Sequence, residues 1–429
     1  MKITTEDVYI DSSKDINHSL LEELVNFDVY LQKSASHEFL FDNMYKLEEE
    51  LLEHGVSKRL LEAIKEGLKY NHWDNAVLEF GLAREQSINF YLGPMCAMEG
   101  KEFKDGIILT KQTSNSSKIV SKVESLCHEL GNRLFGFPCD FHDRHIEFYD
   151  LLFSSGPFSD SNGKYIALFT PFYLGHWKDS NKQFQHKRSI LFHNLVKMRF
   201  STLTLPVAKA NMRINNITPT FIDASKQDID DALTLWLTLH ELIHGSGPIP
   251  LFNSSVQKLP LGLKYAGIEE MRTDMTVWLL LDICQDLFGN IARLAQEIIV
   301  AERIFRSARA GLWANPTQGW IQKSSDGEQG ALWLALLLQH NAIESNTDFI
   351  NIDYEKTKET LQYILSEVYD IESNALKSEN GQQKLLDYAD KLRERMFRNL
   401  DGVLIYPKES LNFLKRIENQ PTHVALNYR

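Results

Sequence analysis

Apolar residues recur at three- and four-residue spacing in three parts of the chain, 19–69, 228–340 and 354–416. This period matches an α-helix, because residues three and four positions apart lie on the same helical face. The pattern therefore predicts a helical beginning, a long helical stretch in the second half, and further amphipathic helices at the end.

Between residues 75 and 219 the pattern changes to short segments rich in aromatic and β-branched residues, bounded by Gly, Ser, Asn and Pro. Such segments are typical of β-strands. We predict strands at 106–110, 164–172 and 201–206, and a turn-rich connection at 154–164.

These changes of pattern divide the chain into four regions. They are a helical N-terminal region (1–75), a mixed α+β lobe (76–219), a helical region (220–345) and C-terminal helices (346–429). A chain of 429 residues can bury at least one large core and form two lobes. The predicted fold class is mainly α in an α+β arrangement, with a helical lobe and a mixed α/β lobe that form a cleft.

The charge of the chain bears on its partners. Its composition is that of an ordinary globular protein, but its formal net charge is −12. A nucleic-acid-binding protein needs a basic stripe that neutralises phosphates. The best local candidate comprises Lys182, Lys187, Arg188, Lys197 and Arg199, which apolar residues interrupt, and we interpret it as a solvated helix face. We expect no nucleic-acid partner.

The sequence also bears on location. Its first residues lack the basic segment and apolar run of a secretory signal, and the apolar runs at 277–281 and 331–338 are too short to span a bilayer. The four cysteines form no CxxC pair, which fits free thiols in a reducing compartment; they are Cys96, Cys127, Cys139 and Cys284. We expect a cytoplasmic protein without a membrane association.

The segment DIDDALTLWLTLHELIHGSGP carries the most informative chemistry. Asp228 is a candidate N-cap and Gly245 a candidate stop of a helix whose largely apolar faces predict burial. His240 and His244 lie four residues apart, so both imidazoles project from the same side and can bind one metal ion. Glu241 is placed to take a proton from a water whose pKa the ion lowers from about 15.7 to about 7.

A third ligand is available in GIEEMRTDMTVWLLL, which follows after a loop. Glu270 is our ligand candidate, and Asp274 lies one turn later on the same face. A zinc-bound imidazole usually donates its free N–H to a carboxylate, and Asp274 is placed for that contact. Glu269 is the weaker ligand candidate, because Thr273 stands four residues beyond it. The alternative is that both glutamates only stabilise a helix N-terminus electrostatically.

The order HExxH followed by ExxxD resembles the gluzincin metallopeptidases. Within it, EEMRTD is similar to the EECRAE-type motif of the dipeptidyl peptidase III family, whose second Glu is the zinc ligand. This resemblance implies zinc ligation by Glu270 and support of a ligand histidine by Asp274. The family usually has HExxGH, whereas HELIHGSGP resembles its shorter relatives with HExxHGxGP.

The resemblance extends over about 147–338. EFYD resembles the family segment with a catalytic-site tyrosine, which implies that Tyr149 stabilises an oxyanion. FRSARAGL, from Phe305 onward, resembles a helix of the shorter relatives. Family members also have a histidine after that helix, and here Asp326 or Glu328 stands in its neighbourhood.

Three further groups have weaker signals. His142 and His145 lie in FHDRHIEFYD, where a second metal site is less favoured than a solvated or substrate-lining segment. The run Cys127-His128-Glu129 has a thiol, but a nucleophile needs a base nearby in space. Arg306 and Arg309 could bind a substrate carboxylate, although surface or structural pairing is favoured.

The sequence therefore predicts a zinc metallohydrolase, with 220–345 as its metal-binding catalytic region. His240, His244 and Glu270 bind zinc, Glu241 is the general base, and Tyr149 assists. The substrate is a peptide, a related amide or another small molecule, and the oligomeric state stays open.

Two alternatives remain at this point. Two histidines and one carboxylate also make the facial triad of iron(II) oxygenases, so a non-haem iron enzyme would use the same residues. A non-enzymatic protein could instead keep the metal for structure, but a structural zinc normally has four protein ligands and only three are convincing here.

Overall fold

The computed structural model separates the chain into two compact units, and each is described by itself. Within the described residues, unit 2 comprises 16–118 and 145–198, and unit 1 comprises 119–135 and 199–417. The described residues are 16–33, 35–83, 86–96, 103–113, 116–135, 145–160, 166–170, 173–175, 188–244, 263–311, 325–345, 349–401 and 403–417.

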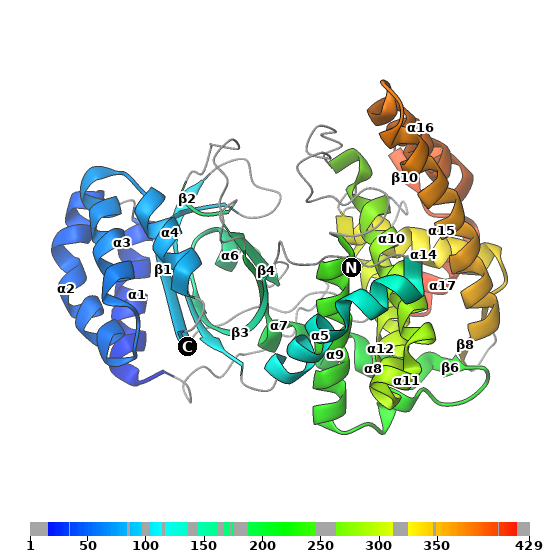
Figure 1. Ribbon diagram of the computed structural model, residues 1–429, viewed down its shortest axis with the longest axis horizontal. Coiled ribbons are helices and arrows are strands. Elements are labelled where there is room, and N and C mark those ends of the chain that lie inside the picture. The colour runs from blue at the N-terminus through cyan, green and yellow to red at the C-terminus, as the bar shows by residue number, and fades with distance from the viewer. Residues whose placement is uncertain are drawn as a thin grey trace. The chain divides into compact units, whose positions relative to one another are not determined.

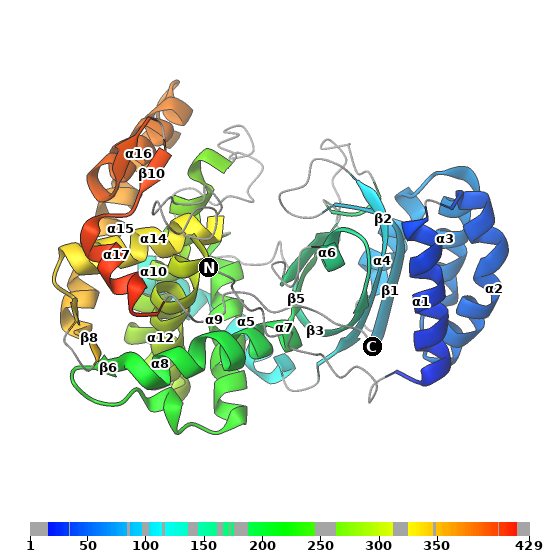
Figure 2. The ribbon, with the colours of Figure 1, turned by 180° about the vertical axis from the view of Figure 1, so that it is seen from behind.

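Unit 2 combines helices with a five-stranded sheet of strand order β1-β2-β3-β5-β4. Only β3 and β5 pair in parallel; the other neighbouring strands are antiparallel. Helices α1 to α4 lie together along one side of this sheet (Figures 1 and 2). The elements are α1 (His18–Gln32), α2 (His37–Glu53), α3 (Lys58–Tyr70), α4 (Asp74–Leu82), β1 (Ile88–Met95), β2 (Lys104–Gln112), β3 (His145–Ser154), α6 (Pro157–Asp160), β4 (Ala167–Thr170), β5 (Arg188–Phe192) and α7 (His193–Arg199).

The helical prediction for 19–69 is confirmed by α1, α2 and α3. Side-chain oxygens of Asn17 and Ser36 accept backbone N–H bonds at the starts of α1 and α2, which satisfies donors that a helix leaves unpaired. Leu24 and Leu47 are fully buried in the core, whereas Val25 is 41% exposed on the outer face. The buried apolar face of these helices therefore includes only some of the apolar residues that define the sequence pattern.

The strand predictions have mixed outcomes. The segment 106–110 lies in β2, and 164–172 contains β4. The strand predicted at 201–206 is wrong, because those residues belong to a π-helix, η3 (Phe200–Thr204), and to the first turn of the helix that follows. The apolar and β-branched character of this segment reflects burial within packed helices, where tertiary context overrides strand propensity.

The indole of Trp73 is packed between α3 and β1 in the core of unit 2. A Cβ added at Gly67 of α3 or at Gly93 of β1 would meet its six-membered ring from either element. Gly93 also has a φ of +144°, a conformation that L side chains rarely adopt. Close packing of α3 and β1 on Trp73 therefore requires glycine at both positions.

Unit 1 is mainly helical, with two small sheets of strand orders β6-β8-β7 and β10-β9. Helix α10 packs against α9, α12, α14 and α15. The elements are α5 (Ser116–Phe135), η3, α8 (Leu205–Asn211), β6 (Met212–Ile214), η4 (Thr220–Ile222), α9 (Lys226–His244), α10 (Leu263–Ile283), α11 (Gln285–Phe288), α12 (Asn290–Ala301), the π-helix η5 (Glu302–Ser307), α13 (Ala308–Gly311), α14 (Ser325–Gln339), β7 (Ile343–Ser345), β8 (Ile350–Ile352), α15 (Tyr354–Leu376), α16 (Gly381–Met396), β9 (Arg398–Leu400), β10 (Val403–Ile405) and α17 (Lys408–Lys415).

The mainly α, α+β fold class is confirmed, but the units differ from the four regions proposed from the sequence. Helix α5 lies inside the proposed mixed lobe, yet all but its first turn belongs to unit 1. Lys122 of α5 donates to the carbonyl of Leu287, and Arg133 pairs with Asp286 at 2.6 Å. The C-terminal region also contains β8, β9 and β10 besides its helices. The boundaries between the two units therefore depend on contacts between residues far apart in the chain, which the local sequence pattern does not show.

The two arginines of the basic stretch do not lie on a solvated helix face, whereas Lys197 is half-buried on α7. Arg188 is 1% exposed in β5 and binds both carboxylate oxygens of Glu147, while Arg199 is buried near Glu302. Lys182 and Lys187 lie outside the described residues. Within the described part of the chain, no helix is both long and apolar enough to cross a membrane.

Replacing Gly93 by alanine should destabilise unit 2 more than the same change at Gly55. Both glycines have positive φ, but a Cβ at Gly55 has no atom within 4 Å, whereas one at Gly93 meets Trp73. Gly55→Ala therefore reports backbone strain alone, and overpacking should add about 1–3 kcal/mol at Gly93. Urea unfolding of the two variants measures the difference, and equal losses would show that the packing around Trp73 tolerates a methyl group.

Candidate metal centre

Helix α9 carries the HELIH residues and is fixed at its start by a side-chain cap. The hydroxyl of Ser225 accepts the backbone N–H of Asp228 at 3.1 Å and donates to the Asp228 carboxylate at 2.7 Å. The cap is therefore Ser225, and the prediction that Asp228 caps this helix is wrong, because the helix starts two residues earlier. Residues 232–244 are all buried, as the apolar pattern predicts, and Gly245 lies outside the described residues.

The structure brings His240, His244 and Glu270 together. One ligand atom from each lies within 4.8 Å of the others, so the three could hold a metal ion. The two imidazole Nε2 atoms are 2.8 Å apart, and Glu270 Oε2 lies 3.2 Å from that of His240 and 3.6 Å from that of His244. The two histidines come from the last turns of α9 and the glutamate from α10.

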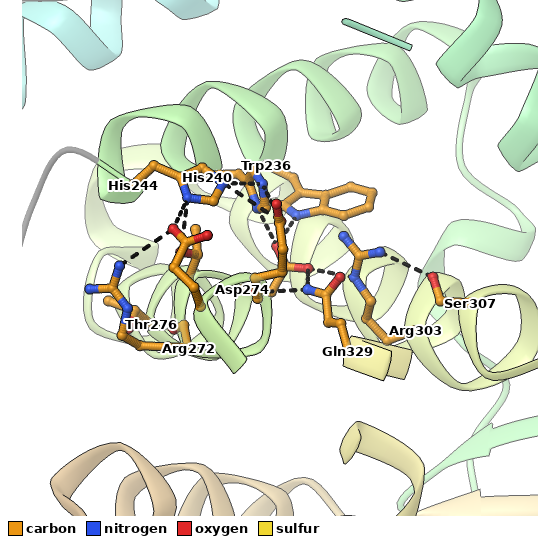
Figure 3. Close-up of polar contacts among 12 residues, drawn as sticks. Trp236, His240, His244, Arg272, Asp274, Thr276, Arg303, Ser307 and Gln329 are labelled. Atoms are coloured by element: carbon orange, nitrogen blue, oxygen red, sulfur yellow. Dashed lines mark hydrogen bonds and ion pairs between the residues drawn. The ribbon is translucent and has the colours of Figure 1, made fainter. Parts of the chain in front are cut away.

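His240 is held by Asp274, one turn after Glu270 on α10. The Nδ1 atom of His240 lies 2.8 Å from Oδ1 of Asp274, which is fully buried (Figure 3). Burial alone would raise the pKa of Asp274, but Arg303 and His240 outweigh it and hold that pKa well below its usual range. The carboxylate is therefore ionised and accepts the Nδ1–H of the imidazole.

His244 has a carboxylate partner of its own, which the sequence analysis missed. Glu269 forms a short contact with its Nδ1 atom, and the hydroxyl of Thr273 lies 3.4 Å from the same nitrogen. Helix α10 begins at Leu263, so Glu269 lies beyond its first turn and is not at the helix N-terminus. The sequence held one indication of this contact: a second ligand histidine also needs an acceptor for its free N–H, and Glu269 is a nearby carboxylate.

This geometry fits a divalent cation. Both Nδ1 atoms face carboxylates, so the two Nε2 atoms face each other and Glu270, where the surrounding carboxylates favour a positive charge. Burial disfavours charge on His244, but Glu269 and Glu270 outweigh it and raise its pKa to about 9. Two imidazole nitrogens and one carboxylate oxygen suit zinc and also iron(II).

The two predicted catalytic residues lie in different units. Glu241 follows His240 on α9 and is 5% exposed. Tyr149 lies on β3 of unit 2, where its hydroxyl donates to Glu147 at 3.0 Å and accepts from Arg188 at 3.0 Å. Burial and the Glu147 charge raise the pKa of Tyr149 to about 12, so the phenol keeps its proton at neutral pH. Its catalytic role stays a prediction.

Arg306 and Arg309 are buried, and their described contacts are structural. Arg306 pairs with Glu302 at 2.5 Å. Arg309 donates to the carbonyl oxygens of Phe305 and Ile417. Burial and the nearby Arg306 charge lower the pKa of Arg309 to about 10, which still leaves it charged at neutral pH.

The other weak candidates gain no support. Glu328, considered at the position of the family histidine, is buried and bound by Arg393, and the side chain of Asp326 lies outside the described residues. The Cys127 thiol is buried and donates to a carbonyl of its own helix. His142 and the side chain of His145 also lie outside the described residues.

Comparisons with known proteins identify the fold. No protein-family model and no curated protein sequence matches the chain. A structure of DPP III from Caldithrix abyssi matches with a TM-score of 0.65 and 14% identity, over 91% of this chain and 70% of that one. Dipeptidyl-peptidase III from Corallococcus sp. strain EGB matches with a TM-score of 0.60 and 17% identity, over 86% and 64%. The chain therefore has a dipeptidyl peptidase III-like fold and is shorter than both neighbours.

Glu270→Gln should weaken metal binding more than Glu269→Gln. The first change replaces a charged ligand atom, whereas the second leaves an amide oxygen that still accepts the His244 N–H. Complete loss of the partner of a ligand histidine typically lowers metal affinity about 10–100-fold, so Glu269→Gln, which keeps an acceptor, should lose less than that. Chelator competition with zinc measures both constants, and a larger loss for Glu269→Gln would reverse the assignment of the two glutamates.

Proposed function

We propose that the chain is a zinc-dependent metallohydrolase that cleaves a peptide or related amide bond. One observation carries the proposal: two Nε2 atoms and the Glu270 carboxylate converge, while a separate carboxylate holds each Nδ1 atom. Three protein ligands are typical of catalytic zinc sites, which keep one position open. The EEMRTD resemblance supports zinc, and the fold of the two dipeptidyl-peptidase III structures supports a peptide substrate.

The proposed reaction assigns a task to each polar group. Zinc, when bound, supplies a Lewis acid that polarises the scissile carbonyl and makes a water acidic at neutral pH. The Glu241 carboxylate takes the proton from the attacking water and passes it to the leaving amine nitrogen.

Asp274 and Glu269 hold the ligand imidazoles in one tautomer. Each accepts an Nδ1–H, so Nε2 is the atom that each histidine offers to a metal once it has lost its proton, and neither ring can rotate without losing a buried hydrogen bond. Loss of such a bond leaves a buried donor unsatisfied, which costs about 1–3 kcal/mol. The ligands are therefore oriented before any ion arrives.

The two alternatives lead to different observations. An iron(II) oxygenase fits the same three donors, so metal analysis of protein purified without added metal, followed by assays with zinc and with anaerobic iron, separates the chemistries. A structural metal normally has four protein ligands, and the described residues supply three in this group. Iron in the purified protein with oxygen-dependent turnover would contradict the hydrolase proposal.

Glu241→Gln should retain zinc and lose most hydrolysis, because the amide has nearly the same shape but cannot take up a proton. The loss expected from removing a general base is about 10²–10⁴-fold in turnover. Peptide hydrolysis and metal content are measured on the same preparation. Asp231→Asn, a carboxylate change on the same helix, serves as the control and should keep both at the parent values. Parent-like turnover in Glu241→Gln would show that another group is the base.

A further inference from the structure

Asp274 accepts hydrogen bonds from three separate helical segments. Its Oδ1 atom accepts from Trp236 Nε1 and His240 Nδ1 of α9, both at 2.8 Å. Its Oδ2 atom accepts from Arg303 Nε of η5 at 2.5 Å and from Gln329 Nε2 of α14 at 2.7 Å. Figure 3 shows these side chains around the carboxylate. Each oxygen thus has two donors, which fixes both its position and its rotation.

Among these described donors, Arg303 is the one with a permanent charge, and it is held in place by its neighbours. It is 4% exposed, its Nη1 atom donates to the Ser307 hydroxyl at 3.1 Å, and its guanidinium lies over the Trp236 ring at 5.2 Å. A guanidinium keeps its charge in proteins. Arg303 therefore holds a fixed positive charge against Oδ2 of Asp274, on the side away from His240.

We propose that Arg303 is a positioning residue for the metal centre. By binding Oδ2 of Asp274, it leaves Oδ1 to orient His240, so that the imidazole Nε2 faces Glu270 and His244. The proposal rests on the proposed function in taking His240 as a metal ligand.

Gln329 extends the same arrangement to the third ligand. Its Nε2 atom donates to the backbone carbonyl of Glu270 at 2.8 Å as well as to Asp274. One amide group thus links the backbone of one ligand to the carboxylate that orients another. Helices α10 and α14 cannot shift relative to each other without disturbing both contacts.

A simpler role for Arg303 is to neutralise a buried carboxylate for stability. Arg306 offers a matched control for that role, because it lies on the same π-helix and is also 4% exposed. It pairs with Glu302 at 2.5 Å and, like Arg303, donates to the Ser307 hydroxyl at 3.1 Å; the other described partners of Glu302 are Thr204 and Arg199. If neutralisation is the whole function, both arginines should affect stability and neither should affect metal binding specifically.

The experiment compares Arg303→Met and Arg306→Met in the full-length chain. Zinc affinity is measured by chelator competition, and the ligand geometry by the visible absorption of the cobalt(II)-substituted protein. We expect Arg303→Met to lower zinc affinity about 10–100-fold and to alter the cobalt spectrum. Arg306→Met should keep the parent affinity and spectrum, even though it also loses stability in urea unfolding.

Parent-like affinity and spectrum in Arg303→Met, or an equal loss in Arg306→Met, overturns the proposal. If Arg303→Met does not fold, Arg303→Lys decides, because it keeps the charge but not the planar donor geometry. That variant should bind zinc less tightly than the parent, and parent affinity in it overturns the proposal. A parent chain that binds neither zinc nor cobalt overturns the proposed function as well, so the two failures are distinguishable.

Discussion

The buried carboxylates of Asp274 and Glu269 impose the main constraint on unit 1. A buried charge without a partner costs several kcal/mol, so some of the helices around these groups must supply donors or cations to them. Asp274 receives donors from α9, η5 and α14, and Glu269 contacts His244 of α9. Polar contacts within an otherwise apolar core therefore help to specify how α9, η5 and α14 pack around α10, and the three candidate ligands lie within that arrangement.

Local spacing in the sequence was enough to find the three candidate ligands and Asp274. His240 and His244, like Glu270 and Asp274, are four residues apart, and helical periodicity alone puts each pair on one face. Long-range partners had no such signal. Gln329 lies 55 residues from Asp274 in the sequence. Glu269 and Glu270 are the same residue type at adjacent positions, and only their different directions from α10 decide which one faces the Nε2 atoms and which one contacts Nδ1 of His244. The site's inner residues could be predicted, whereas those that orient them depend on how the helices pack.

The errors in the predicted fold have a related cause. Composition does not distinguish an arginine at the surface from one that binds a carboxylate in the core, so Arg188 was interpreted as part of a solvated face. The segment 201–206 has the composition of a strand, but its Thr204 hydroxyl binds Glu302 between two π-helices. In both cases a buried polar partner, invisible in the local pattern, decides the structure. The helices predicted from long periodic stretches were reliable, because that periodicity requires only that one face of each helix is buried, whatever its partners are.

The distribution of charge around the three ligands favours electrophilic chemistry. Asp274 faces Arg303, and Glu269 faces Arg272 at 3.6 Å, so each outer carboxylate has its own cation. Glu372 also lies near Arg272, but burial raises the pKa of Glu372 to about 7 and weakens its competition for that charge. Glu270 is then the carboxylate whose negative charge is left for a divalent ion, and with such an ion bound the centre would keep a net positive charge. With such an ion bound, the centre would stabilise the developing oxyanion of the proposed hydrolysis, and we propose the carboxylate of Glu241, next to His240, as the proton acceptor of that reaction.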